Sequence, residues 1–375
     1  MMSNTKNPGL YIHVPFCRTK CPYCDFYSVT SPSLVPEWMN GLRREALIYK
    51  DRFTAFDSLY LGGGTPTLLA GHELAALMDG LSRHFTFLPD TEITIEANPD
   101  DVTLEKLTLL RDLGVNRISL GAQSFDDREL QYLGRRHTAR QTDKAMEWIR
   151  ASGFTNAGLD LMYGFAGQTE AGWVETMKHA LAFEPEHLSC YQMTPEEGTP
   201  FGKMLADGRI KPLEEEKERD FFLLTSTFLE EHGYIHYEIS NFARGEEFFS
   251  RHNRKYWQHV PYLGLGPSAH SFQDGVRWWD YRSIRKYCRA LAEGKPPVDG
   301  TETLSAEQLR LEALYLGFRT RDGVSMKTLH NSSPQADRIL SRLQESGLVR
   351  IIKDRVLPTR EGFAVADRLP LLFSE

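Results

Sequence analysis

Three cysteines lie close together near the start of the chain, and their spacing is the strongest chemical signal in the sequence. They are Cys17, Cys21 and Cys24, in the pattern Cys-x3-Cys-x2-Cys. A structural zinc site normally uses four ligands, and no second cysteine pair occurs in this chain. A four-iron cluster usually takes four cysteine thiolates, so three leave one iron open to a small molecule. The triplet therefore favours an iron–sulfur cluster with an exchangeable ligand, and zinc held by the triplet with His13 is the alternative.

A run of glycines forms the second candidate element. Gly62-Gly63-Gly64-Thr65-Pro66 follows a short apolar segment. Three residues without a Cβ allow the backbone to approach a ligand closely. The same run is also typical of a tight turn without a ligand.

Polar residues recur at the ends of otherwise apolar segments. Glu96 follows Ile93-Thr94-Ile95, Gln123 follows Ile118-Ser119-Leu120, and Asp160 lies between Leu159 and Leu161. In αβ barrels the ligand face is the carboxyl end of the strands. The three side chains are therefore expected to lie together at the carboxyl-end opening of the barrel. The alternatives are a helix cap or loop hydrogen bond for Glu96 and Gln123, and a buried pair with an arginine for Asp160.

Repeated βα units must position these residues. From residue 9 to about 195, short β-branched or aromatic runs alternate with helical patterns, which predicts a parallel sheet. Thr103 opens one such helix, whose leucine stripe ends at Gly114. The expected fold class is α/β, a partial (β/α)6 TIM-like barrel. The predicted strands are 10–14, 57–61, 92–97, 117–121, 158–163 and 187–192.

A separate C-terminal module follows. Ser305-Ala306-Glu307-Gln308 has capping-box spacing and predicts a helix. Residues 348–352 and 356–357 resemble a short hairpin after a helix, as in a winged helix. The expected domains are 1–240, a linking region 241–300 and a helical, winged-helix-like domain 301–375. The acidic run 214–218 is interpreted as the first turn of a solvated helix.

Composition excludes several classes of protein. Of 375 residues, 41% are hydrophobic and 25% charged, which is typical of globular domains. The net charge of −7 argues against a dedicated nucleic-acid binder. No apolar run is long enough to span a bilayer, and the polar start lacks the centre of a signal peptide, so a cytosolic protein is expected. Cys190 and Cys288 stand alone and are expected to fill core space.

The cysteine pattern, with Tyr23 before the third cysteine, resembles the signature of radical S-adenosylmethionine (SAM) proteins. The resemblance implies a [4Fe-4S] cluster on the three cysteines, with SAM chelating the open iron and giving a 5′-deoxyadenosyl radical on reduction. It covers most of the chain, from Tyr11 to about Phe272 and again in the C-terminal helices. Within the family, the chain resembles the coproporphyrinogen oxidase branch, which can hold two SAM molecules. The SAM-contacting positions that the branch implies are Tyr11, Tyr23, Gly63, Gly64, Thr65, Glu96, Gln123, Arg135 and Asp160; without the family, Arg135 would be interpreted as part of a solvated helix end.

Two departures distinguish the chain from oxygen-independent coproporphyrinogen III oxidase. Phe26 stands where the oxidase pattern has a fourth cysteine, and ten residues precede Tyr11 where the oxidase has a long arm. His252-Asn253-Arg254-Lys255-Tyr256-Trp257 instead matches the His-Asn-x-x-Tyr-Trp element of the oxidase-like haem chaperones. Oxidative decarboxylation of coproporphyrinogen, and with it enzyme activity, is therefore in doubt and is the alternative function.

The haem-chaperone resemblance implies haem as a ligand. Imidazole is a common axial ligand of haem iron, and two aromatic rings suit a flat macrocycle. His252 is the leading candidate ligand, with His259 and His270 as alternatives, and a satisfied structural histidine is the other interpretation. The expected partners are haem and an acceptor haemoprotein, including one at a membrane, with no nucleic acid; the chain would act as a monomer or dimer.

Overall fold

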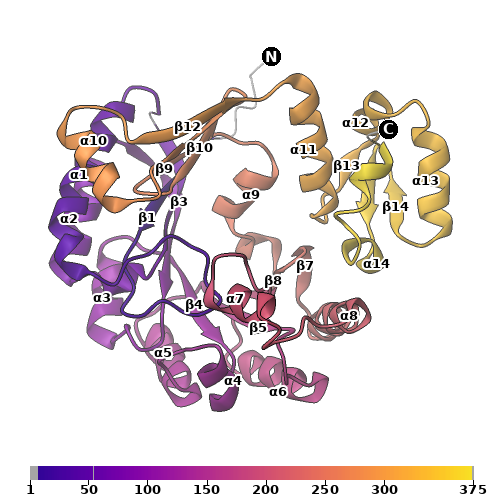
Figure 1. Cartoon of the computed structure of the whole chain (residues 1–375), viewed down its shortest axis with the longest axis horizontal. Coiled ribbons are helices and arrows are strands. Elements are labelled where there is room, and N and C mark those ends of the chain that lie inside the picture. Colours follow the sequence, from indigo (N-terminus) through magenta and orange to yellow (C-terminus); the bar gives the residue numbers. More distant parts are fainter. Residues whose placement is uncertain (1–6, 54, 374–375) are drawn as a thin grey trace.

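Six parallel strands form the centre of the fold. The computed structural model describes residues 7–53 and 55–373. Each of the six strands pairs in parallel with the next one along the chain, and helices make the crossovers (Figure 1). All six predicted strands are confirmed, although β3 begins earlier, at Thr86. The strands are β1 (Gly9–Val14), β2 (Ala55–Gly63), β3 (Thr86–Ala97), β4 (Arg117–Gln123), β5 (Ala157–Tyr163) and β6 (His187–Gln192).

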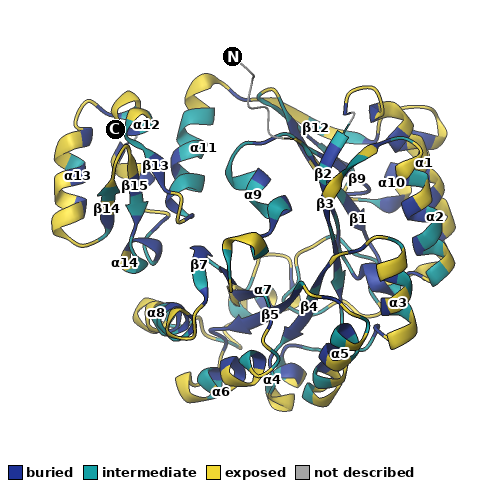
Figure 2. Cartoon of the chain, turned by 180° about the vertical axis from the view of Figure 1, so that it is seen from behind, coloured by how far each residue is buried: buried dark blue, intermediate teal, exposed yellow. Residues whose placement is uncertain are grey.

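Helices cover the convex side of this sheet, and their outer faces are exposed while the strands are buried (Figure 2). Several begin at a threonine that accepts a hydrogen bond from the first turn, as Thr103 does from the Lys106 amide. The acidic run begins a helix, as predicted. The helices are α1 (Val35–Tyr49), α2 (Gly71–Ser82), α3 (Leu104–Asp112), α4 (Asp127–Tyr132), α5 (Ala139–Ala151), α6 (Glu170–Leu181), α7 (Pro200–Ala206) and α8 (Glu215–Glu231), with 3-10 turns η1 (Pro32–Leu34) and η2 (Pro66–Leu68).

The segment expected to link two domains belongs to the main sheet instead. Both edges of the parallel strands are extended, giving the order β12-β11-β10-β9-β1-β2-β3-β4-β5-β6-β8-β7. β9 pairs in parallel with β1, whereas β8 pairs antiparallel to β6. Most of residues 241–300 therefore extend the sheet. The added elements are β7 (Ile235–Glu238), β8 (Asn241–Ala243), η3 (Glu246–Phe248), α9 (Arg251–Trp257), β9 (Tyr262–Leu265), β10 (His270–Gln273), β11 (Val276–Asp280), α10 (Ile284–Ala292) and β12 (Val298–Thr303).

The C-terminal module has its own small core and lies beside the main sheet (Figure 1). The Ser305 capping box and the predicted hairpin are both present. Arg360 joins the module to α8 through hydrogen bonds to Ser226 Oγ and Thr227 Oγ1. Its elements are α11 (Ala306–Phe318), β13 (Val324–Ser325), α12 (Met326–Ser332), α13 (Ala336–Glu345), β14 (Val349–Ile352), β15 (Arg355–Pro358), α14 (Arg360–Phe363) and η4 (Pro370–Phe373).

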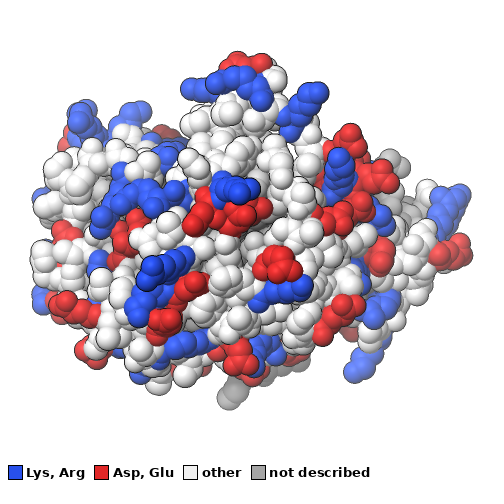
Figure 3. Space-filling view, turned by 90° about the horizontal axis from the view of Figure 1, so that it is seen from below, with Lys and Arg blue, Asp and Glu red and all other residues white. Residues whose placement is uncertain are grey.

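The surface agrees with the balanced charge of the sequence. Lysine and arginine alternate with aspartate and glutamate over the face shown in Figure 3. Among the described residues, no helix is both long and apolar enough to cross a membrane. The start of the chain, on which the signal-peptide prediction depends, lies largely outside the described residues.

A buried pair of carboxyl groups ties the added strands to α1. Glu45 and Asp280 are 0% and 2% exposed, and Glu45 Oε2 accepts hydrogen bonds from the Gly266 amide and the Tyr287 hydroxyl. Burial raises the pKa of both carboxyls, and in Asp280 the neighbouring Glu45 charge raises the pKa further. Two buried carboxyls in contact are stable when they share a proton. The extension of the sheet therefore depends on a protonated group.

This pair predicts a pH-dependent stability. Because both folded-state pKa values are raised, the stabilisation is present at low pH and is lost as the pH rises. In Glu45→Gln the amide donates to Asp280 without needing a proton. We expect the melting temperature of the unsubstituted chain to fall between pH 6 and 9 by at least about 3 °C more than that of Glu45→Gln. Glu37→Gln, an exposed change on the same helix, should melt like the original chain at both pH values; equal pH sensitivity in all three proteins would contradict the shared proton.

Candidate functional site

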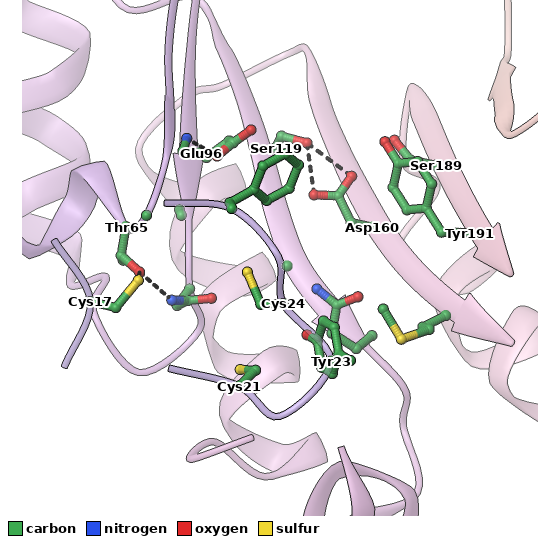
Figure 4. A pocket seen from close by; sticks show the side chains of 18 of the residues that line it. Cys17, Cys21, Tyr23, Cys24, Thr65, Glu96, Ser119, Asp160, Ser189 and Tyr191 are labelled. Atoms are coloured by element: carbon green, nitrogen blue, oxygen red, sulfur yellow. Dashed lines mark hydrogen bonds between the residues drawn. The ribbon is translucent and has the colours of Figure 1, made fainter. Parts of the chain in front are cut away.

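A cavity of about 590 Å³ with many polar side chains in its wall lies inside the curved sheet, at the carboxyl ends of the parallel strands. The three cysteines line it from the loop after β1, and side chains from β2 to β6 line it from the sheet (Figure 4). The predicted site residues Tyr23, Gly63, Gly64, Thr65, Glu96, Gln123, Arg135 and Asp160 all line this cavity. The carboxyl-end rule thus correctly placed residues that are far apart in the sequence.

The loop that carries the cysteines is fixed at both ends. The Cys17 amide donates to the Val29 carbonyl at 3.0 Å, and His13 Nε2 lies 2.8 Å from the Tyr27 carbonyl. Arg282 pairs with Asp25 Oδ1 at 2.8 Å. Phe26, at the position of the fourth cysteine in the oxidase pattern, is 68% exposed at the cavity wall. The loop is therefore anchored while its thiols face the cavity.

The thiols carry hydrogen-bond donors of their own. Thr65 Oγ1 donates to Cys17 Sγ at 3.7 Å, and Arg135 Nη1 lies 3.6 Å from Cys21 Sγ. Burial raises the pKa of Cys17 and Cys24. Within the described part of the chain, no three His, Cys, Asp or Glu side chains are gathered tightly enough for a single metal ion. A four-iron cluster distributes its cysteine ligands over separate irons.

Close packing around the glycine run excludes side chains there, which the sequence alone did not reveal. Gly63 has φ of +106°, and a Cβ there would lie 2.5 Å from His13 Cε1. A Cβ on Gly64 would lie 2.6 Å from the Phe16 carbonyl oxygen. The glycines thus let β2 pass close to β1 and to the cysteine loop. The Gly63 amide remains available to donate to Glu96 Oε2 at 3.0 Å.

The strand register arranges the inward side chains in rows across the sheet. Side chains two residues apart along a strand face the same side, so each row lies about 7 Å from the next. The first row is nearest the amino ends of the strands, and the third is nearest the cysteine loop. The rows are Tyr60, Thr94 and Arg117; then Glu96, Ser119 and His187; then Gly121, Asp160 and Ser189.

Two carboxyl groups face the cavity from the second and third rows. Glu96 accepts from the Tyr60 hydroxyl at 2.9 Å, and burial with the nearby Asp160 charge raises its pKa to about 7. Asp160 accepts from Ser119 Oγ at 3.1 Å, and burial raises its pKa too. Neither carboxylate has a Lys, Arg or His nitrogen within 4.0 Å in the described part of the chain. The arrangement suits a ligand that brings positive charge.

Arg135 joins the cysteine loop to the sheet and is not at a solvated helix end. Its Nη1 lies 3.5 Å from the Tyr23 hydroxyl, and its Nη2 donates to the Gly121 carbonyl at 2.9 Å and to Asn98 Oδ1. Tyr23 and Cys21 raise the pKa of Arg135 against the effect of burial. Gln123, at φ of +68°, ends β4 beside this contact.

Two predicted residues lie below the cavity and do not line it in this structure. The Tyr11 hydroxyl is 3.1 Å from His13 Nδ1, so Tyr11 supports the histidine that holds the cysteine loop. His252 is 1% exposed, with Nδ1 3.1 Å from Ser58 Oγ and Nε2 2.8 Å from the Tyr256 hydroxyl. Burial lowers the pKa of His252 to about 3. Its imidazole is neutral and both ring nitrogens are occupied.

Several cavity residues were not identified from the sequence. They include the polar side chains Tyr60, Thr94, Asn98, Arg117, Ser119, His187, Ser189 and Tyr191. Alternation within the strands could have found many of them, because they lie two residues before or after a predicted site residue or its neighbour in register. The isolated cysteines Cys190 and Cys288 are 1% and 5% exposed and lie in the core, as predicted.

Comparison with known proteins assigns this architecture to a family. Residues 11–180 match the model of the radical SAM superfamily, and residues 304–365 match the HemN C-terminal domain. The chain resembles the structure of coproporphyrinogen III oxidase (HemN) from Escherichia coli, with a TM-score of 0.84 and 23% identity over 99% of this chain and 90% of that one. This similarity confirms the fold.

Sequence relatives are more specific. The chain is 36% identical to the heme chaperone HemW of Bacillus subtilis over 94% of its own length and 95% of the relative. It is 34% identical to the mitochondrial radical S-adenosyl methionine domain-containing protein 1 of Mus musculus, over 98% of this chain and 88% of the relative. The chain belongs to the HemW family of radical SAM proteins, relatives of HemN.

Proposed function

We propose that this protein is a haem chaperone that binds haem and transfers it to an acceptor haemoprotein. The observation that carries the proposal is the 36% identity with a heme chaperone over nearly the whole of both chains. The His-Asn-x-x-Tyr-Trp segment and Phe26 at the fourth cysteine position support it. The similarity to the oxidase HemN is lower and concerns the fold. Five cysteines without a disulfide suit the reducing cytosol, where we place the protein.

We infer that Cys17, Cys21 and Cys24 hold a [4Fe-4S] cluster. The three thiols line one cavity, and their loop is anchored to the strand before it. The hydrogen bonds from Thr65 and Arg135 to two of the sulfur atoms would tune the reduction potential. With three protein ligands, one iron stays open to SAM, whose reductive cleavage supplies a 5′-deoxyadenosyl radical in this superfamily.

The cavity beside the cysteines fits SAM, which carries a sulfonium and an ammonium group. Glu96 and Asp160 are buried carboxyls with raised pKa values, and neither has a cationic nitrogen within 4.0 Å among the described residues, although the more distant Arg117 and Arg135 lower the pKa of Asp160. Positive charge on the ligand would therefore offset the cost of their ionisation. We assign Glu96 to the ammonium group and Asp160, with Ser119, to a hydroxyl-bearing part. Gly63, Gly64, Thr65, Gln123, Tyr23 and Arg135 complete the wall, and Tyr11 acts from behind His13.

The surroundings of the three candidate histidines favour a different haem ligand from the one expected from the sequence. Ligation by His252 would require its imidazole to leave Ser58 and Tyr256. His259 Nε2 is 3.2 Å from Glu312 Oε2. His270 is exposed on β10, stacks on Trp279 with ring centroids 5.9 Å apart, and neither of its ring nitrogens has a hydrogen-bond partner in the described part of the chain. We therefore expect His270 to ligate haem iron and His252 to support the fold.

The cluster assignment predicts a clean division among the cysteines. Replacing Cys17, Cys21 or Cys24 by Ala should abolish the broad iron–sulfur absorption of anaerobically reconstituted protein. Cys190→Ala and Cys288→Ala serve as controls and should keep the absorption, because these thiols are buried in the core. Visible absorption with iron and sulfide analysis checks this. Stoichiometric zinc without iron or sulfide would contradict the assignment.

The raised pKa of Glu96 predicts a pH-dependent affinity for SAM. The carboxyl must lose its proton to pair with an ammonium group, so affinity should rise with pH up to about 7 and level off above it. Below that point we expect a loss of up to about tenfold per pH unit. Anaerobic calorimetry between pH 5.5 and 8.5 measures the slope.

Glu96→Gln should bind SAM roughly tenfold or more weakly, with a flat pH profile over the same range. Glu129→Gln is the matched control, because Glu129 is also part-buried with a raised pKa but does not line the cavity. Its SAM binding should keep the original slope. An unchanged slope in Glu96→Gln would assign the titration to another group.

The haem proposal predicts a Soret band that survives gel filtration after haem is added to reconstituted protein. His270→Ala should weaken haem binding about tenfold or more, because the iron would lose an axial ligand. His252→Ala should keep haem but melt at a lower temperature, and His72→Ala, an exposed control on α2, should do neither. If His252→Ala alone lost haem, His252 would be the axial ligand instead of His270.

Two results would contradict the chaperone function itself. One is the absence of a Soret band in the unsubstituted chain. The other is conversion of coproporphyrinogen to its decarboxylated product with SAM and a reductant, which would favour the oxidase alternative. Anaerobic haem titration with and without SAM separates these outcomes.

A further inference from the structure

The inner end of the cavity carries a set of polar groups that neither the cluster nor SAM accounts for. It is formed by the first row of the sheet, which lies one row deeper than Glu96 and two rows deeper than Asp160. Arg117 is the only lysine or arginine among the residues that line this end of the cavity. The cysteine loop lies at the opposite end, beyond the third row.

Arg117 is a buried cation with no ion pair among the described residues, although its charge lowers the pKa of the more distant Asp160. Its side chain is 3% exposed, and no carboxylate of the described residues lies within 4.0 Å of it. Nη1 donates to Asn156 Oδ1 at 3.2 Å and to the Phe248 carbonyl at 2.9 Å. Nε and Nη2 make no hydrogen bond to the described part of the chain. A guanidinium group held out of water is costly unless an anion compensates it.

His187 presents a second donor from the neighbouring row. It is 2% exposed, and its Nε2 lies 2.7 Å from the Tyr237 hydroxyl, which accepts from the Ser250 amide. When the Tyr237 hydroxyl donates to Nε2, the His187 proton is on Nδ1. Nδ1 is buried without a partner in the described residues, and it faces Gly158, where a Cβ would lie 3.4 Å away.

Thr94 and Asn253 complete the set. Thr94 stands between Tyr60 and Arg117 in register, is 0% exposed, and has an Oγ1 without a partner in the described residues. Asn253 enters the cavity from α9, on the side away from the cysteine loop. Three buried side chains from three strands thus carry hydrogen-bonding groups that have no partner in the described residues, all three line the same cavity, and the only full charge among them is positive.

We propose that the inner end of the cavity binds an oxyanion group, a carboxylate or a phosphate, of a second small molecule, with Arg117, His187 and Thr94 as its ligands. The carboxylate of a SAM molecule at the open iron would not fill this place, because the open iron would lie beside the cysteine loop, at the opposite end of the cavity. Glu96 and Asp160 lie between the two ends. The cavity therefore has a cation-accepting outer part and an anion-accepting inner part, and the second molecule would lie against the SAM site.

The test is a titration of the full, cluster-reconstituted chain saturated with SAM, so that the open iron cannot take up the probe. The probes are sodium phosphate and sodium propionate, against sodium chloride at equal ionic strength. We expect at least one oxyanion to bind by calorimetry, and the comparison of the two distinguishes phosphate from carboxylate recognition. Arg117→Gln should weaken this binding about tenfold or more, and Thr94→Val severalfold without loss of volume.

Arg83→Gln is the matched control, because it removes the same charge from an exposed ion pair at the C-terminal end of α2. It should bind the oxyanion like the unsubstituted chain. If Arg117→Gln fails to fold, Thr94→Val and the nitrogen chemical shift of His187 Nδ1 on titration test the same contact. Binding that is absent, equal to that of chloride, or unchanged in Arg117→Gln and Thr94→Val would overturn the proposal. Neither titration contains haem, so the outcome leaves the test of the chaperone function independent.

Discussion

A carboxylate that is held away from water needs compensation, and this fold meets that need in different ways at different places. Glu45 lies against Asp280, where burial raises the pKa of both carboxyls and favours a shared proton, and Glu92 accepts hydrogen bonds from the amides of Arg251 and His252. Glu96 and Asp160 receive only hydroxyl and amide donors and face an open cavity. The first two carboxyls are satisfied by the chain itself. Glu96 and Asp160 are fully compensated only when a cation enters the cavity. We therefore expect these two carboxyls to bind the ligand.

The sequence predicted the parallel sheet and the location of the cavity at its carboxyl edge, because two simple rules apply here. Period-two alternation marks the strands, and parallel strands bring their carboxyl ends to one edge. Glu96, Gln123 and Asp160 were found at that edge without any distance information. The cysteine triplet needed no fold, since its spacing alone restricts the chemistry. For Asp160 the alternative of a buried arginine pair is not found within 4.0 Å among the described residues, and Ser119 donates to it instead.

The sequence could not predict which neighbouring residue packs against each polar side chain. His252 beside Tyr256 and Trp257 suits a macrocycle or the chain's own core equally well, and only the packing of Tyr60 and Ser58 against the ring decides. Arg117 looks like the charged start of a strand. It faces the cavity because β4 is inserted between β3 and β5 at one particular register. Residues 241–300 carry short strands that join the main sheet through two distant pairs, β9 with β1 and β8 with β6, so local patterns suggested a linker.

The His-Asn-x-x-Tyr-Trp segment connects these observations. It forms α9, whose Asn253 lines the inner end of the cavity while His252 and Tyr256 pack beneath it. Lys255 fixes the helix to the sheet through Asp57 Oδ1 at 2.5 Å and the Asn7 carbonyl at 2.7 Å. The segment thus forms the floor of the cavity rather than an exposed haem-facing surface. Since the floor sets how deep the cavity reaches and which groups line its end, this motif bears on what can lie against SAM, whereas an exposed side chain such as His270 can meet a macrocycle without disturbing it.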